Sequence, residues 1–531
     1  GCMYGVYELL ERYIGWRFFY NKQTDSYLTK DADDAYYLYD SEHVDIPAGI
    51  NDTQVPSFAY RQGRYTWYYN YDEHAKLRES RSLRNLSKYN GYGSATFSAA
   101  VHGFRDAVNA GVIPDYDYGG YDIGSPQPCY NNEEVVEAAK TYFLGQIEKK
   151  IASGYEIGKD ITVVDVAQLD SGSFCKCKTC INAIAKERSG VASVLYFTNE
   201  MADAIGEAYP GLWVSMFAYY GTSTPPAKTM PRDNVNVSYC FYNDIDKLTC
   251  GNHTLDGKNC TEHPDDSYGT SNYNYAAEFD RWCQIAKRIT VWYYPGNWAL
   301  NSITNSTIKT MLKDMRYFSD NGVYGIYPCC SNPKKETDWE SIDALMLYLY
   351  NRLLWNAEMT EEEFQAEIDD YLYVLYGEGG KFVGDYYKWL ETTDMIGCWP
   401  FMLGFGDPRK RIDFSKVHDE FELCLSMFDD AVKYAPSAKA EYGVRLASRS
   451  MYVRGLISVY HDWYENGNDA QKARYTELWE YFRNLAVNSS YIFAGGKSAQ
   501  LSDFDINENI GALVDRLGDS PMREKEWWNW Q

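Results

Sequence analysis

The sequence predicts an α/β protein centred on a (β/α)8 TIM barrel, preceded by the remnant of an N-terminal α/β domain and followed by a C-terminal α-helical domain. From residue 57 to about residue 355, apolar strand-like runs alternate with stretches of helical periodicity, with the size and rhythm of such a barrel. One run, Ile161 to Val166, leads directly to Asp170 on a cysteine-rich loop. Beyond Trp355 the strand-like runs largely stop and helical periodicity continues.

The composition is that of an acidic, folded globular protein. The chain has 531 residues, 45% hydrophobic and 24% charged, enough for several domains with ample core. Its net charge of −24 argues against nucleic-acid binding, which needs a basic surface. No uncharged apolar run approaches the ~20 residues of a membrane helix, so we expect no membrane span in this fragment. We treat the chain as a fragment because it begins at Gly1 rather than Met, and any signal peptide would lie upstream.

Aromatic residues are unusually frequent. The 50 Tyr and 15 Trp bring aromatic residues to 16% of the chain, and rings with a polar tip suit stacking on sugars in a polar cleft. Packing of tyrosine in the core and at the surface explains the number equally well. The 13 cysteines are odd in number and irregularly spaced, so they do not indicate a small disulfide scaffold and leave the redox compartment open.

Residues 1–50 form the first predicted unit, the C-terminal remnant of an α/β domain. Apolar residues recur at i, i+3, i+4 and i+7 from Val6 to Tyr13, which predicts an amphipathic helix that ends at Gly15. The following WRFFY predicts a strand. The polar, turn-rich stretch up to Pro56 is expected to be a linker.

Residues 56–358 form the predicted barrel domain. Its predicted strands are SFAY near residue 57, SATFSAAVH, a poorly marked third strand between Ile113 and Cys129, ITVVDVA, LWVSMFAYY, VNVSYCFY, ITVWYY and VYGIYP. Predicted helices follow the fourth strand and lie around residues 278–288, 305–319 and 339–354. Long loops at residues 116–127 and 243–274 interrupt the alternation, and such loops often carry function. Residues 360–531 are predicted to be a helical domain with a loop-rich tail.

Seven segments resemble a known bacterial family and occur in the family's order. They are GVYELLERYIGWRFF, PCYNNEEVVEAAK, VVDVAQLDSGSFCKCKTC, FAYYGTSTPPAKTMPRDNVNV, ITVWYYPGNWA, NGVYGIYP and LYNRLLWN, within residues 1 to about 380. The family comprises proteins with domain of unknown function 4838, also classed as glycoside hydrolase family 163. The resemblance implies a secreted TIM-barrel protein with endo-β-N-acetylglucosaminidase activity on N-glycans. The chain departs from the family at two acidic positions, where it has Tyr293 and, in the stretch YPCC, Pro328. If such an acid carries catalysis, this protein is altered in mechanism or inactive.

Asp170 is the strongest candidate for a catalytic residue. It follows a buried strand, where an α/β barrel presents its catalytic groups, and the resemblance supports that role. The alternative is that Asp170 caps the Ser-Gly-Ser turn. Glycoside cleavage also needs a second polar group, which the sequence does not single out. Candidates are Asp165 within the strand, Asp117, Asp122, Glu262 and Asp265 on the long loops, and Glu336 and Asp338 after the eighth strand.

Residues at other predicted strand ends suit a sugar-binding cleft. The substrate-binding candidates are His102, Tyr219, Tyr220, Tyr294, Asn297, Trp298 and Arg61. A histidine at a strand end can hydrogen-bond a sugar hydroxyl or tune a nearby carboxylate. Aromatic rings beside an amide suit stacking on a pyranose. Structural roles in the core are the alternative for each of these residues.

Cys175, Cys177 and Cys180 form a C-x-C-x2-C cluster on the loop that carries Asp170. Three thiolates need a fourth ligand, Cys129 or a histidine, to complete a zinc site. A disulfide plus a free thiol is the alternative, and we expect a structural role in either case. The adjacent pair at residues 329–330 is best explained as buried, unreactive thiols.

The sequence therefore predicts a glycoside hydrolase, extracellular or at the cell surface, that acts on glycans containing N-acetylhexosamine. Substrate-assisted catalysis is a candidate mechanism. One alternative is a catalytically degenerate barrel that binds glycans, and another is a metal-dependent hydrolase that uses the cysteine cluster with His253 or His263. We expect a carbohydrate ligand, no cofactor and no nucleic-acid partner, and the sequence does not specify an oligomeric state.

Overall fold

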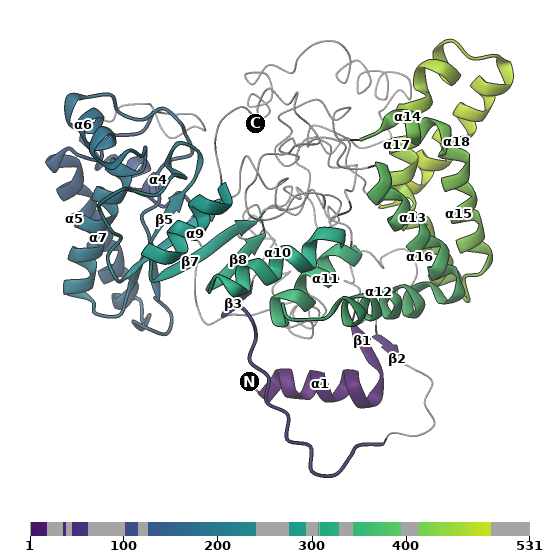
Figure 1. The fold of residues 1–531 in the computed structure, drawn as a ribbon, viewed down its shortest axis with the longest axis horizontal. Coiled ribbons are helices and arrows are strands. Elements are labelled where there is room, and N and C mark those ends of the chain that lie inside the picture. The colour runs from purple at the N-terminus through teal and green to yellow at the C-terminus, as the bar shows by residue number, and fades with distance from the viewer. Residues whose placement is uncertain are drawn as a thin grey trace.

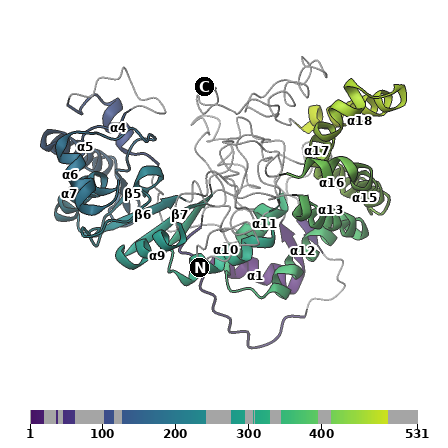
Figure 2. The same cartoon turned by 45° about the horizontal axis from the view of Figure 1, so that its top comes forward.

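The computed structural model describes residues 2–18, 36–38, 45–61, 101–114, 126–240, 275–293, 306, 308–328, 344–393 and 412–489. These residues form a curled parallel sheet with its helices, a short N-terminal unit, and a group of C-terminal helices. Figure 1 shows the sheet and its helices from the left to the centre, the C-terminal helices on the right and the N-terminal unit below. In the tilted view of Figure 2, α5, α6 and α7 at one end of the sheet and the C-terminal helices α13 to α18 again lie on opposite sides.

The N-terminal unit consists of helix α1 (Cys2–Ile14) and strands β1 (Trp16–Phe18) and β2 (Tyr36–Leu38), which pair antiparallel. The predicted helix and the strand after it are confirmed. Gly15 has a φ of +80°, the left-handed conformation that ends a helix at low cost when the residue is glycine. The Arg17 guanidinium donates to the Asp370 carboxylate at 2.5 Å, which ties this unit to the helices that follow the sheet.

The main sheet has six described strands, all parallel, in the order β3-β8-β7-β6-β5-β4. The strands are β3 (Tyr60–Arg61), β4 (Val163–Asp165), β5 (Trp213–Ala218), β6 (Val235–Cys240), β7 (Arg288–Tyr293) and β8 (Gly325–Pro328). Each coincides with one of the apolar runs predicted as a strand. The carboxyl ends of parallel strands lie at one edge of the sheet, which is where ligands bind in α/β proteins.

The sheet corrects the predicted architecture. The prediction of a closed eight-stranded (β/α)8 barrel is wrong, because the described residues form an open, curled six-stranded sheet with β3 and β4 at its edges. Beside β4, the end of the second predicted strand (residues 101–102) forms no ladder. Instead, the Asp165 carboxylate accepts the backbone N–H groups of Val101 at 2.6 Å and Gly103 at 3.0 Å. Most of the second predicted strand and the middle of the third lie outside the described residues.

Alternation along the strands gives the sheet two different faces. One face is apolar, and residues such as Val214, Val237 and Val291 are fully buried on it. Helix α7 contacts β5 and β6, and helix α9 contacts β7. Burying an apolar strand face under helices is the usual source of stability in a parallel sheet.

The opposite face carries polar and aromatic side chains. Asn236 on β6 donates to Ser215 Oγ on β5 at 3.1 Å and to Thr290 Oγ1 on β7 at 3.0 Å. Two residues further along β5 and β7 are Phe217 and Trp292, whose rings meet edge to face with centroids 5.2 Å apart. This face therefore changes from a hydrogen-bonded polar layer to an aromatic layer towards the carboxyl ends of the strands.

A cation–π stack closes the amino ends of three strands. The Arg288 guanidinium, at the start of β7, lies 3.5 Å from the Trp213 ring centroid at the start of β5 and 4.1 Å from that of Tyr324 just before β8. Stacking on two rings suits a planar guanidinium. The stack fixes the end of the sheet that lies away from Asp170.

The helices associated with the sheet are α4 (Phe104–Asn109), α5 (Glu133–Ala152), α6 (Lys178–Glu187), α7 (Ala192–Ala208), α9 (Tyr275–Ile285), α10 (Ile308–Asp320) and α11 (Ala344–Trp355), with the short 3-10 helix η1 (Tyr220–Thr222). Helix α5 begins where the Asn132 side chain accepts the N–H of Glu134 at 3.0 Å. Its first turn is acidic and its last turn is basic. Charges in this order interact favourably with the helix dipole and stabilise the helix.

The C-terminal part of the described chain is helical. Its elements are α12 (Glu361–Tyr376), η2 (Gly377–Gly379), α13 (Gly380–Thr393), α14 (Phe414–Asp419), α15 (Phe421–Lys433), α16 (Ala438–Ala447), α17 (Arg449–Val459), the π-helix η4 (Tyr460–Glu465) and α18 (Asp469–Ser489). Helix α12 begins in a capping box formed by Thr360 and Glu363. Among the described helices, none is long and apolar enough to span a lipid bilayer.

Candidate active site

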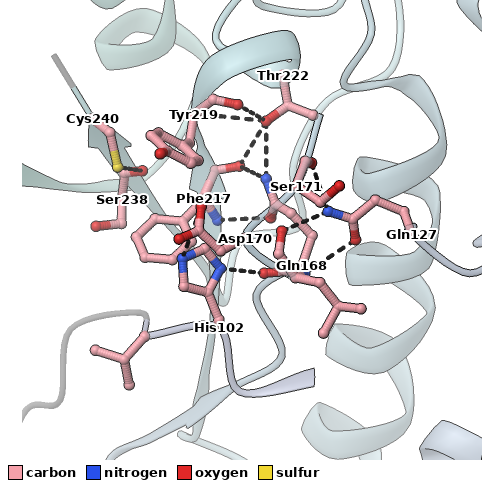
Figure 3. A network of polar contacts seen from close by, with 12 residues as sticks. His102, Gln127, Gln168, Asp170, Ser171, Phe217, Tyr219, Thr222, Ser238 and Cys240 are labelled. Atoms are coloured by element: carbon pink, nitrogen blue, oxygen red, sulfur yellow. Dashed lines mark hydrogen bonds and ion pairs between the residues drawn. The ribbon is translucent and has the colours of Figure 1, made fainter. Parts of the chain in front are cut away.

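The candidate site lies at the carboxyl end of β4 (Figure 3). Beyond this strand the chain runs through Gln168 to Asp170, whose side chain is 25% exposed. The His102 ring, from the segment before α4, points its Nε2 atom at Asp170 Oδ1 over 3.9 Å. The structure thus brings together two of the residues that the sequence singled out.

His102 is held in an uncommon backbone conformation. Its φ is +59°, in the left-handed region that residues other than glycine rarely adopt. The Nδ1 atom lies 2.5 Å from the carbonyl oxygen of Gln168. A carbonyl can only accept, so Nδ1 carries the proton and the neutral ring presents the unprotonated Nε2 towards Asp170. Burial lowers the pKa of His102, although Asp170 opposes that effect, so the ring is neutral near pH 7.

Asp165 holds the backbone on both sides of His102. Its carboxylate accepts the N–H groups of Val101 and Gly103, and also that of Ala167 at 2.9 Å. Burial raises the pKa of Asp165 to about 7, while these three donors pull it down. A Cβ atom on Gly103 would lie 2.1 Å from the Asp165 carbonyl oxygen, so only glycine fits at that position. Asp165 therefore positions the His102 segment, and both oxygens of its carboxylate accept backbone hydrogen bonds.

Gln168 joins the end of β4 to the end of β5. Its amide accepts the Phe217 N–H at 3.3 Å and donates to the Phe217 carbonyl at 3.1 Å, which continues the ladder with a side chain. The same amide donates to Thr222 Oγ1 at 2.9 Å, and Thr222 Oγ1 accepts the Tyr219 N–H at 3.1 Å. These bonds fix the turn that carries Tyr219.

Two aromatic rings lie against His102. The His102 ring lies 4.7 Å from the Phe217 centroid and meets the Tyr219 ring edge-on at 6.2 Å. Tyr219 is partly exposed, as a sugar-contacting ring would be. For Tyr220 the structure describes only the backbone, in η1.

Gln127 fixes the loop that carries Asp170. Its amide nitrogen donates to the carbonyls of Leu169 at 2.5 Å and Ser171 at 2.8 Å, and its amide oxygen accepts the Leu169 N–H at 3.1 Å. The Gln127 N–H also donates to the Ser173 carbonyl at 2.9 Å. The buried Gln127 side chain therefore holds the backbone on both sides of Asp170.

Cys129 completes the cysteine cluster. Its sulfur lies 3.8 Å from that of Cys177 and 3.7 Å from that of Cys180, and the four sulfurs, with that of Cys175, all lie within 4.8 Å of one another. All four thiols are free of disulfide bonds. The sequence had named Cys129 as one candidate for the fourth member.

Arg61 has contacts of a structural kind. Its guanidinium donates to the Phe58 carbonyl at 2.7 Å and lies 5.2 Å from the Trp355 ring centroid and 5.9 Å from that of Tyr4. The other predicted substrate-binding residues, Tyr294, Asn297 and Trp298, lie outside the described residues. So do His253, His263, the pair at residues 329–330, and the candidate second acids Asp117, Asp122, Glu262, Asp265, Glu336 and Asp338.

Residues 32–388, more than half of the chain, match the sequence model of a protein family described as "Domain of unknown function (DUF4838)". The chain belongs to this family. No curated protein matches the DUF4838 chain. Among solved structures, the chain is similar to a GH138 enzyme targeting pectin rhamnogalacturonan II, with a TM-score of 0.35 and 10% identity over 87% of this chain and 67% of that chain. A likeness of this size carries no argument about chemistry.

At Tyr293 and Pro328, the two positions where this DUF4838 chain departs from the acidic residues expected by resemblance, the strands β7 and β8 pair with each other. Tyr293 is fully buried on the apolar face, and its ring is parallel to that of Tyr350 at 6.0 Å. Burial raises the pKa of Tyr293 well above its usual value, and nearby Asp314 adds to the effect. The Tyr293 hydroxyl is therefore a core group on the face away from Phe217.

Sequence reasoning missed Gln127, Gln168 and Thr222 as members of the site. Gln168 lies two residues before Asp170 at a strand end, and that position was a usable signal. Gln127 and Thr222 carried no such signal, because their roles depend on contacts with residues distant in the chain: Leu169 and Ser171 for Gln127, and Gln168 for Thr222.

Proposed function

We propose that this chain is a glycoside hydrolase acting on glycans that contain N-acetylhexosamine. The observation that carries the proposal is the pair of hydrogen-bond acceptors at the carboxyl end of β4: Asp170 Oδ1 and the unprotonated Nε2 of His102, 3.9 Å apart. The pair is partly exposed at Asp170 and bordered by the Tyr219 ring.

The chemistry follows from the hydrogen-bonding capacity of the two groups. A carboxylate and a neutral imidazole nitrogen that face each other both need a donor, and a sugar supplies hydroxyl and acetamido N–H groups. A carboxylate that accepts the N–H of the substrate's acetamido group makes the carbonyl oxygen of that acetamido group more nucleophilic. This oxygen can then attack the anomeric carbon in substrate-assisted cleavage. The resemblance of the sequence to glycoside hydrolase family 163 supports the choice of N-acetylhexosamine.

Asp170→Asn tests the proposal. The variant should release at least about 100-fold less glycan from an N-glycoprotein, measured by mass spectrometry, because the amide presents a donor where a carboxylate accepted. Asp106→Asn, on the exposed side of α4, is the matched control and should keep full activity. Equal melting temperatures would show that both variants fold. Undiminished glycan release by Asp170→Asn would remove Asp170 from the mechanism.

Synthetic substrates distinguish the two roles open to Asp170. If Asp170 polarises the acetamido group, Asp170→Asn should lose activity equally on the natural glycan and on an aryl N-acetylglucosaminide with a good leaving group. If Asp170 is the general acid, the aryl substrate should recover most of the rate, because its leaving group departs without protonation.

A catalytically degenerate, glycan-binding protein is the second candidate. The observation that favours it is the combination of Tyr293, which is buried in the core, with Pro328 in β8, where the resemblance led us to expect acids. Calorimetric titration with an N-glycan decides between the candidates. Binding without any glycan release over prolonged incubation would support the binding protein, and turnover would support the hydrolase.

The proposed substrate also bears on location. Glycoprotein glycans are large and polar and do not cross membranes, so we propose that the protein works outside the cell or on its surface. Detection of the native protein in the extracellular or surface fraction would support this location, and detection only in the cytosol would contradict it.

A further inference from the structure

The four clustered cysteines come from two segments that are far apart in the sequence. Cys129 lies three residues before Asn132, the N-cap of α5, whereas Cys175 and Cys177 lie on the loop after β4 and Cys180 lies in the first turn of α6. Folding nevertheless brings their sulfurs to within 4.8 Å of one another. A chance meeting of four thiols without disulfide bonds is improbable in a chain with 13 cysteines.

Two of the sulfur–sulfur distances match those expected around a single metal ion. A tetrahedral zinc site with Zn–S bonds of about 2.3 Å requires neighbouring sulfurs about 3.8 Å apart. The two edges of the cluster that run from Cys129 to Cys177 and to Cys180 measure 3.8 Å and 3.7 Å. A disulfide would place its sulfurs only about 2.05 Å apart.

One sulfur of the cluster accepts a hydrogen bond from an asparagine side chain of the segment before α5. The Asn131 side chain donates to the Cys180 sulfur at 3.3 Å and to Ser193 Oγ at 2.6 Å. An outer-sphere donor of this kind offsets part of the excess negative charge of a metal bound by four thiolates.

We propose that Cys129, Cys175, Cys177 and Cys180 bind one structural zinc ion. Four thiolates fill the tetrahedral shell and leave no open position for water or substrate. The metal would join the loop after β4, which carries Asp170, to the segment that begins α5. Gln127 makes its bonds to the same loop only two residues before Cys129, so the ion and the amide would hold the loop together.

Elemental analysis of the purified chain is the first test. The chain, prepared under reducing conditions without a metal-affinity tag, should contain about one zinc ion per molecule, and a strong chelator should remove it and lower the melting temperature by several degrees. Two disulfides within the cluster and no bound metal would overturn the proposal, and so would stoichiometric iron in place of zinc.

Single variants locate the metal. Cys177→Ser should lose most of the zinc, whereas Cys283→Ser, at a half-buried free thiol on α9, should retain it. Zinc retained in full by Cys177→Ser would overturn the assignment. Reloading the unmutated apo chain with Co²⁺ provides a readout that needs no variant: intense thiolate-to-cobalt absorption supports the site, and its absence overturns it. These outcomes are independent of glycan cleavage, so the zinc site stands or falls separately from the proposed function.

Discussion

At the scale of single residues, His102 combines a strained backbone with a defined protonation state. The carbonyl of Gln168 fixes the proton on Nδ1, and the left-handed φ of +59° directs the ring at Asp170. Strain of this kind persists only where the surroundings enforce it, as the three N–H donors to Asp165 and the contact at Gly103 do here. The left-handed conformation of His102 is thus maintained by the Asp165 carboxylate, which accepts three backbone N–H groups.

A pair of variants at this position separates backbone strain from the role of the ring. His102→Gly and His102→Ala both remove the imidazole and should both lose glycan-cleaving activity. The glycine variant should be more stable than the alanine variant by about 1 kcal/mol, because glycine adopts positive φ without steric cost. Urea denaturation followed by fluorescence measures the difference. Equal stabilities would show that the left-handed conformation is not retained in solution.

At the scale of elements, the loop from β4 to α6 is fixed by bonds from three directions. Gln168 bonds it to β5, Gln127 bonds it to the segment before α5, and the cysteine cluster joins it to Cys129. These attachments hold the backbone on both sides of Asp170. Rigid presentation of this kind is what catalytic side chains require.

Gln127→Ala tests how much this attachment contributes. The substitution removes the acceptor of the buried Leu169 N–H and a donor to the carbonyls of Leu169 and Ser171, so it should destabilise the protein by about 2–3 kcal/mol. It should also lower kcat more than it raises KM, because Asp170 becomes less well positioned. Gln365→Ala, which removes an exposed side-chain bond to Asp369, is the matched control and should change neither. An unchanged kcat in Gln127→Ala would mean that the loop keeps its place without the amide.

The sequence predicted where the strands of the sheet lie, but it did not predict the hydrogen bonds that connect them to their neighbours. Apolar runs located β5 to β8 because these parallel strands are buried and rich in apolar and aromatic residues. Barrel closure was assumed from the number of runs, but the Asp165 carboxylate occupies the backbone donors beside β4, and hydrogen bonding of that kind has no signature in hydropathy. Asp170 and His102 could be proposed from the sequence because each follows an apolar run, and the structure places their side chains 3.9 Å apart. The Gln127 contacts were not, since they join segments 42 and 44 residues apart.

At the scale of the whole molecule, a cluster of charges joins the N-terminal unit to the helices beyond the sheet. Arg352 on α11 pairs with Glu11 on α1 at 2.9 Å and with Glu367 on α12 at 2.7 Å. Burial raises the pKa of Glu11, and Arg352 opposes that rise. The three side chains are partly exposed, so water moderates the interaction.

Arg352→Ala should destabilise the protein by about 2–3 kcal/mol, because Glu11 and Glu367 lose the cation that they share. Without Arg352 the pKa of Glu11 rises further, so ionisation of this group opposes folding more strongly. The loss of melting temperature relative to the unmutated chain should therefore be larger at pH 8 than at pH 5. Arg12→Ala, which removes a surface ion pair with Glu8, is the control and should cost less than about 1 kcal/mol at either pH. A loss independent of pH would argue that Arg352 acts through packing alone.

The stack of Arg288 between Trp213 and Tyr324 has a consequence for how such a chain can diversify. It fixes the amino ends of the strands, while Asp170 and His102 lie at the carboxyl end of β4. The stack that fixes the sheet and the proposed active site therefore lie at opposite ends of the sheet. Insertions and exchanges in the carboxyl-end loops can accumulate over evolution, or be introduced by loop grafting, while the scaffold beneath them keeps its fold.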